Sequence, residues 1–120
     1  MHRFLKIRFK KLMQSLEGGF QDAAQKALEE FTIIYHYAPD DPWIHMQLAQ
    51  SYRALSMFEK EIEEYEAILK MSPLDQQVLF RLGMLYFEHG QNAKGLQIYE
   101  ELKRSNLKKA EQLIVFYGAS

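Results

Sequence analysis

Apolar residues recur along this chain at the three- and four-residue spacing that places side chains on one face of an α-helix. The pattern is clear in residues 3–17, where Leu5, Phe9, Leu12 and Leu16 share a face. Comparable stretches follow, and helix-breaking residues separate them. The segments predicted to be helical are 3–17, 21–37, 42–55, 58–71, 76–88, 92–104 and 107–117.

Aspartate, proline and glycine mark the ends of several of these segments. Asp41 precedes Pro42, which is typical of a helix start, because the aspartate accepts from a free backbone N–H and proline lacks only an N–H that has no helical partner. Asp75 is expected to cap the segment after it in the same way. Gly90 is expected just past the end of that segment, where glycine is common.

The last segment is also compatible with a second structure. Residues 113–117 (LIVFY) are five consecutive apolar residues. Some of them are β-branched, as in a strand. We predict a helix, because every earlier segment is helical and the sequence offers no evident partner strand. The predicted fold class is therefore all-α.

The sequence also repeats itself. Segment 48–52 (LAQSY) returns 34 positions later as 82–86 (LGMLY), and Tyr65 is matched by Tyr99. A fixed period in this range indicates stacked supersecondary units, which commonly present surfaces for binding other proteins. We predict a single domain, 1–120, of helix–turn–helix units at about 3–39, 42–73 and 76–107, with a terminal helix at 108–117.

The repeated residues resemble the signature of the tetratricopeptide repeat family. The matching positions are Leu48, Ala49, Tyr52, Phe58, Tyr65 and Pro73 in one unit, and Leu82, Gly83, Tyr86, Gly90, Gly95 and Tyr99 in the next. The resemblance is good over 42–107 and fair over 20–41. It departs from the family at Glu61, where a small residue is expected, at Asn92, where an aromatic is expected, and at Leu107, which replaces a proline.

The resemblance implies a short α–α superhelix of about three units with a capping helix, and a protein-binding role without catalysis. The alternative is a generic helical bundle in which the similarity of the two segments arose by chance. In this family the first helix of each pair lines a concave groove. Carried over to this chain, the groove residues are Trp43, Met46, Gln50, Arg53, Phe80, Arg81, Met84 and Phe87.

Aromatic and methionine side chains in this set suit an apolar peptide or one face of an amphipathic helix. A clamp for a terminal carboxylate is not expected, because family members that have one use Lys and Asn at these places. The alternative, weighed equally, is that Met46, Phe80 and Met84 are buried against the first helix or the C-terminal segment. Small chaperones of bacterial secretion systems resemble this chain in size and repeat type, so a chaperone or adaptor is the specific form of the prediction.

Composition narrows the chemistry. The chain has no cysteine, which excludes disulfides, thiolate zinc sites and thiol catalysis. None of its four histidines lies three or four residues from another, and no carboxylate completes a metal-ligand set. The glutamates within 59–66 fit a solvated helix face. We therefore expect no enzyme, no metal and no cofactor, and the net charge of −1 gives no case for nucleic acid.

Location and assembly are predicted from the two ends. No apolar run is long enough to span a bilayer and no signal peptide is evident, so the cytoplasm is expected. Residues 3–16 are basic and amphipathic, which also fits a membrane-surface helix. Residues 113–117 are apolar for a terminal repeat, which suggests a homo-oligomer. The alternative function is therefore a membrane-peripheral assembly factor that uses both ends.

Overall fold

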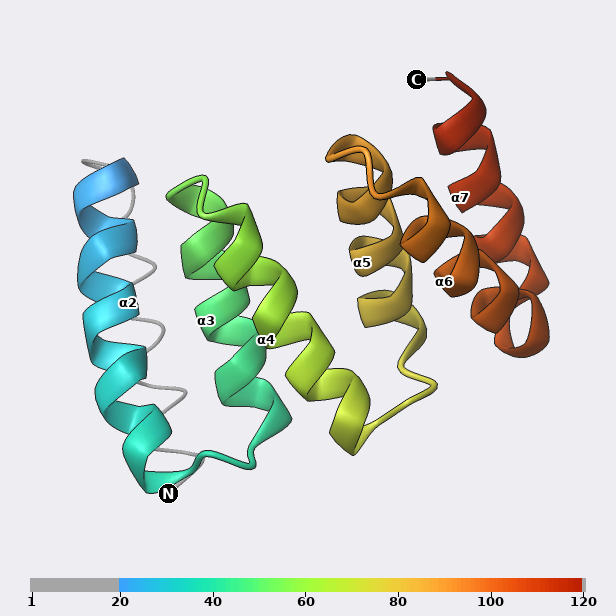
Figure 1. The fold of residues 1–120 in the computed structure, drawn as a ribbon. Helices are drawn as coiled ribbons and strands as arrows, with labels where there is room; N and C mark the ends of the chain where they lie inside the picture. Colours follow the sequence, from blue (N-terminus) through green and yellow to red (C-terminus); the bar gives the residue numbers. More distant parts are fainter. Residues whose placement is uncertain (1–19, 120) are drawn as a thin grey trace. The chain divides into compact units, whose positions relative to one another are not determined.

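The structure, a computed structural model, describes residues 20–119, and the predicted helix at 3–17 lies outside them. The described residues form six helices and no strand (Figure 1). The helices are α2 (Phe20–Tyr37), α3 (Pro42–Ala54), α4 (Phe58–Met71), α5 (Gln76–Glu88), α6 (Asn92–Ser105) and α7 (Leu107–Ala119). The all-α prediction is confirmed, and the strand alternative for 113–117 is wrong, because these residues lie within α7.

Both predicted aspartate caps are present, at equivalent positions of the repeat. The N–H of Trp43 donates to Oδ1 of Asp41 at 2.9 Å, and the N–H of Val78 donates to Oδ1 of Asp75 at 3.1 Å. Each carboxylate thereby satisfies one of the backbone donors that a helix start leaves free. The sequence period is thus also a period in local structure.

The ends of α3 and α5 repeat in the same way. Ser56 and Gly90 both have positive φ, 57° and 76°. One residue further on, the N–H of Met57 donates to the carbonyl of Tyr52, and the N–H of Gln91 donates to the carbonyl of Tyr86, both at 2.8 Å. The first unit therefore forms with serine a turn that favours glycine.

The chain divides into two compact units, with the boundary inside α4 after Glu64. In the first unit α2 packs on α3. Its core consists of apolar side chains from these two helices, namely Ala27, Phe31, Ile34, Ile44 and Leu48. This core fixes which faces of α2 and α3 point inward.

In the second unit α5 packs on both α6 and α7, and α6 packs on α7. The core consists of Leu79, Phe87, Leu102, Ala110 and Leu113. Gly83 is where α7 approaches closely, because a Cβ built there lies 2.6 Å from Cδ2 of Leu113. The absence of a side chain at Gly83 thus lets α7 lie close to α5 at this point.

Glu61, one of the residues at which the sequence departs from the family signature, is buried in the structure. Glu61 is 1% exposed, and its equivalent in the next unit is Gly95, where an added Cβ would meet the ring of Phe87. The N–H groups of Glu61 and Gly95 make equivalent bonds of 3.0 Å, to the carbonyls of Met57 and Gln91. The backbone therefore repeats even where the side chains do not.

Candidate protein-binding surfaces

The predicted groove residues of α3 share one face of that helix. We call Trp43, Met46, Gln50 and Arg53 the α3 row, since they follow one another at intervals of three or four positions. Gln50 and Arg53 are exposed, whereas Trp43 and Met46 are half-buried. Ile44 and Leu48, on the opposite face, are almost wholly buried, and so is Ala49, which lies beside the row. The α3 row is therefore the more accessible side of α3.

Trp43 also holds α3 against α2. Its ring meets the ring of Phe31 edge to face, with centroids 5.9 Å apart and an interplanar angle of 80°. Such aromatic pairs add about 0.5–1.5 kcal/mol beyond the area that they bury. Trp43 is thus anchored through its contact with Phe31 while part of its surface stays accessible.

The predicted residues of α5, which we call the α5 row, are Phe80, Arg81, Met84 and Phe87. Arg81 is exposed, Phe80 and Met84 are half-buried, and Phe87 is 6% exposed. Phe80 and Met84 pack against the core cluster that includes Ala110 and Leu113 of α7. The C-terminal segment therefore covers part of this row, which is the alternative that the sequence leaves open.

Two contacts hold α7 there. The rings of Phe87 and Tyr117 are stacked, with centroids 4.3 Å apart. Nζ of Lys109 lies 5.4 Å from the centroid of the Phe80 ring. This separation is within the range of cation–π attraction. The role of Phe87 in partner binding stays a prediction, and it requires α7 to move.

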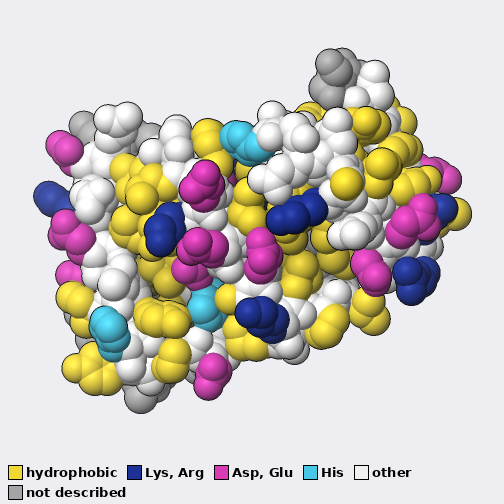
Figure 2. All heavy atoms as spheres, in the orientation of Figure 1, with side chains coloured by type: hydrophobic (Ala, Val, Ile, Leu, Met, Phe, Trp, Pro, Cys, Tyr) yellow, Lys and Arg dark blue, Asp and Glu magenta, His cyan; other side chains and the backbone are white. Residues whose placement is uncertain are grey.

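Most of the apolar run in α7 faces inward. Leu113 is fully buried, and Ile114, Phe116 and Tyr117 are half-buried. Val115 is 68% exposed and Leu107 57% exposed. Hydrophobic side chains are visible over α7 in Figure 2. Self-association through 113–117 stays a prediction that depends mainly on Val115.

His45 has a structural role that its sequence position does not reveal. It is 6% exposed, its Nδ1 lies 2.6 Å from Oε2 of Glu64, and its Nε2 lies 2.7 Å from the carbonyl oxygen of Pro39. The imidazole thereby connects α4 to the loop before α3. Glu64, which the sequence places on a solvated face, is held in the first unit by this bond.

Tyr86 on α5 forms a side-chain hydrogen bond with α4. Its hydroxyl donates to Oε1 of Glu66 at 3.2 Å. Burial, and then the charge and hydrogen bond of Glu66, raise the pKa of Tyr86 to about 12. Each of these causes favours the neutral phenol over the phenolate. The hydroxyl is therefore neutral at physiological pH and serves as a donor.

The described residues contain no group of three or more histidines and carboxylates placed to hold a metal ion. Within the same residues, no helix combines the length and the apolar character needed to cross a membrane.

Comparison with known families agrees with the helical fold of the second unit. Residues 77–106, which lie in α5 and α6, match the family model of the tetratricopeptide repeat. No curated protein matches the chain. Segment 77–106 is therefore similar to a tetratricopeptide repeat, and the all-α architecture of residues 20–119 is consistent with a fold of this type. Repeats of this class are protein–protein interaction modules and are typically not catalytic.

Proposed function

We propose that the chain binds an apolar or amphipathic segment of a partner protein, as a small chaperone or adaptor. The α3 row is the principal contact surface in this proposal. The accessible parts of Phe80, Arg81 and Met84 on the α5 row provide a second surface of the same kind.

The observation that carries the proposal is the mixed character of the α3 row. Met46 and Trp43 offer half-exposed apolar surface, and Arg53 and Gln50 offer exposed polar groups on the same helix face. Methionine adapts its shape to irregular partners, and tryptophan and arginine are common among residues that dominate binding energy. This combination fits the apolar face and the polar margin of an amphipathic segment.

The α5 row supports the chemistry of this ligand. Phe80, Met84 and Phe87 are the residues 34 positions after Met46, Gln50 and Arg53. Phe87 is stacked on Tyr117 of α7, Phe80 lies beside Lys109 of α7, and Met84 packs against the core cluster that includes Ala110 and Leu113. The α5 positions that are equivalent to the α3 row therefore pack against an amphipathic helix of the chain itself, α7.

The test begins with peptides selected by display against the full chain, then made with a fluorescent label. We expect the selected sequences to be apolar or amphipathic, and their anisotropy to rise on binding. Arg53→Glu and Met46→Glu should each weaken binding by at least about five-fold, which corresponds to a loss of about 1 kcal/mol.

Matched controls separate the α3 row from general effects of charge. Lys26→Glu and Met57→Glu make similar changes at exposed positions outside the row. They should leave binding unchanged, and thermal melts should show that all four variants fold. Equal weakening by the row variants and by the controls would contradict the proposal.

A further inference from the structure

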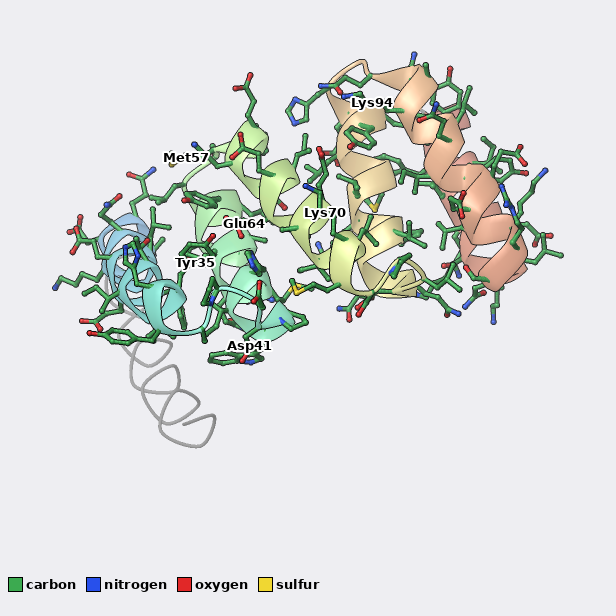
Figure 3. All side chains as sticks on the ribbon, turned by 60° about the horizontal axis from the view of Figure 1, so that its bottom comes forward. Tyr35, Asp41, Met57, Glu64, Lys70 and Lys94 are labelled. Carbon is green, nitrogen blue, oxygen red and sulfur yellow. The ribbon has the colours of Figure 1, made fainter. Side chains whose placement is uncertain are left out.

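A hollow of about 260 Å³ lies in the first unit, away from the α3 row. Its walls include Tyr35 from α2, Leu48 and Tyr52 from α3, and Lys60, Glu63 and Glu64 from α4. In Figure 3 the labelled Tyr35 and Glu64 lie close together beside α3. Pockets for drug-sized ligands usually measure about 300–1,000 Å³, so this hollow suits one side chain or a small molecule.

The hollow combines aromatic walls with carboxylates. Tyr35 and Tyr52 are half-buried, and both line the opening. Aromatic faces attract ammonium and guanidinium groups, and carboxylates accept charge-assisted hydrogen bonds from the same groups. The lining is therefore suited to a cation on an aliphatic stem, for which Leu48 adds apolar surface.

The charges near Tyr52 favour a cation over an anion. Burial is the main cause that raises the pKa of Tyr52, and the charge of Glu64 is the next. Glu63 acts in the same direction, whereas Lys60 opposes both and has a smaller effect than Glu64. The carboxylates thus outweigh the one lysine at this point. His36 also belongs to the lining, and it adds positive charge only when protonated.

The second unit contains a related arrangement made by the chain itself. Tyr86 and Lys94 stand 34 positions after Tyr52 and Lys60. Nζ of Lys94, labelled in Figure 3, lies 5.7 Å from the centroid of the Tyr86 ring. In the first unit Nζ of Lys60 lies 3.6 Å from Oε2 of Glu63, on the exposed side of α4. In the second unit the lysine therefore lies over the tyrosine ring. In the first unit the equivalent lysine, Lys60, pairs with the carboxylate of Glu63 instead.

We propose that the hollow binds the cationic end of a lysine or arginine side chain from a protein partner. The stem lies against Leu48 and the ring of Tyr52, and the charged group meets Glu63 and Glu64. Glu64 is already oriented by its 2.6 Å bond to His45, so little order is lost on binding. The incoming cation competes with Lys60 for Glu63, because that pair is exposed and therefore weak.

The test uses NMR titrations of the full chain with small probes. The probes are a capped Gly-Ser-Lys-Ser-Gly peptide, its arginine and norleucine counterparts, spermidine and inorganic phosphate. We expect the lysine and arginine peptides to shift the signals of Tyr35, Tyr52 and Glu63, and the neutral norleucine peptide to leave them unchanged. Spermidine that binds more tightly than either peptide would reassign the site to free amines. Phosphate that shifts these signals would overturn the choice of a cation.

Three substitutions on α4 sharpen the result. Glu63→Gln should weaken binding of the lysine peptide by about two- to five-fold, which is the range expected for a partly exposed ion pair. Lys60→Gln should strengthen binding of the same peptide, because a competing cation is removed. Glu59→Gln makes the same charge change as Glu63→Gln outside the lining, and it should have no effect. All three positions are exposed, so folding is preserved. Binding that Lys60→Gln weakens, or that Glu63→Gln leaves unchanged, would overturn the proposal.

Discussion

The ring of Phe87 on α5 is stacked on the ring of Tyr117 on α7, with a centroid distance of 4.3 Å and an interplanar angle of 30°. Phe87 is the last residue of the α5 row, and it is only 6% exposed. The stacked pair therefore joins α7 to the end of that row. The position of α7 therefore decides how much of that row a partner can reach.

Tyr117→Ala should loosen α7 and expose the ring of Phe87. Full removal of a buried aromatic costs about 3–5 kcal/mol, and Tyr117 is half-buried, so we expect the free energy of unfolding to fall by about 1–3 kcal/mol. Val115→Ala is the matched control, since Val115 is largely exposed. Surface changes of this kind lie within about 0.5 kcal/mol. Urea unfolding measures both, and equal effects of the two substitutions would show that α7 is not held by this stack.

Gly83→Ala tests the close approach of α7 to α5. The added methyl would lie 2.6 Å from Cδ2 of Leu113. Overpacking of this kind costs about 1–3 kcal/mol. That cost exceeds the gain of about 0.5–1 kcal/mol that alanine brings to a helix. Gly118→Ala meets nothing within 4 Å and should therefore stabilise the protein slightly. Thermal melts that move in the same direction for both variants would contradict this packing.

Ser56 and Gly90 provide a reciprocal experiment on the repeated turn, because both have positive φ. A left-handed conformation costs a non-glycine residue about 1–2 kcal/mol. Ser56→Gly should therefore stabilise the fold by about 0.5–1 kcal/mol after the entropy of glycine is included. Gly90→Ser should lower stability by a similar amount. Denaturant unfolding of the two variants and of the double mutant, in which the effects should cancel, checks the expected equivalence. A loss of stability in Ser56→Gly would contradict it.

Tyr86 should titrate at a higher pH than an ordinary tyrosine. Its pKa in the folded chain is about 12, against about 10 in the unfolded chain, so the folded state favours the neutral hydroxyl. The resulting contribution to stability is complete below about pH 10, and it is lost as the pH rises through about 12. Ultraviolet titration of tyrosinate should lose its step near pH 12 in Tyr86→Phe, and Glu66→Gln should lower the pH of that step. A profile that Tyr86→Phe leaves unchanged at high pH would refute this assignment.

Much of the fold follows from local signals in the sequence. Asp41 and Asp75 mark helix starts because capping depends on a side chain and its nearest backbone N–H groups. The period of 34 predicts equivalent positions such as Tyr52 and Tyr86, since a repeat fold depends on contacts between adjacent elements. These features need no knowledge of contacts between distant residues.

The surfaces can be predicted only in part. The burial of Phe87 depends on the path of α7, and no local pattern around Phe87 encodes that path. The acidic residues around Glu64 predict a solvated helix face. In the structure, however, Oε2 of Glu64 lies 2.6 Å from Nδ1 of His45, nineteen residues earlier. The hollow beside Tyr35 escapes prediction for the same reason, because its lining comes from three helices. Its one sequence signal is the pairing of Tyr52 with Lys60 at the register of Tyr86 with Lys94.

The most direct test of the account uses Trp43, the single tryptophan of the chain, which lies in the α3 row. Its fluorescence should be recorded while the full chain is titrated with a display-selected peptide that lacks tryptophan. We predict a saturable change in emission that gives the same dissociation constant as the anisotropy of the labelled peptide, and that Arg53→Glu weakens both while Lys26→Glu weakens neither. Saturable anisotropy with no change in Trp43 emission, and with full binding by Arg53→Glu, would show that the partner binds elsewhere and would contradict the central claim.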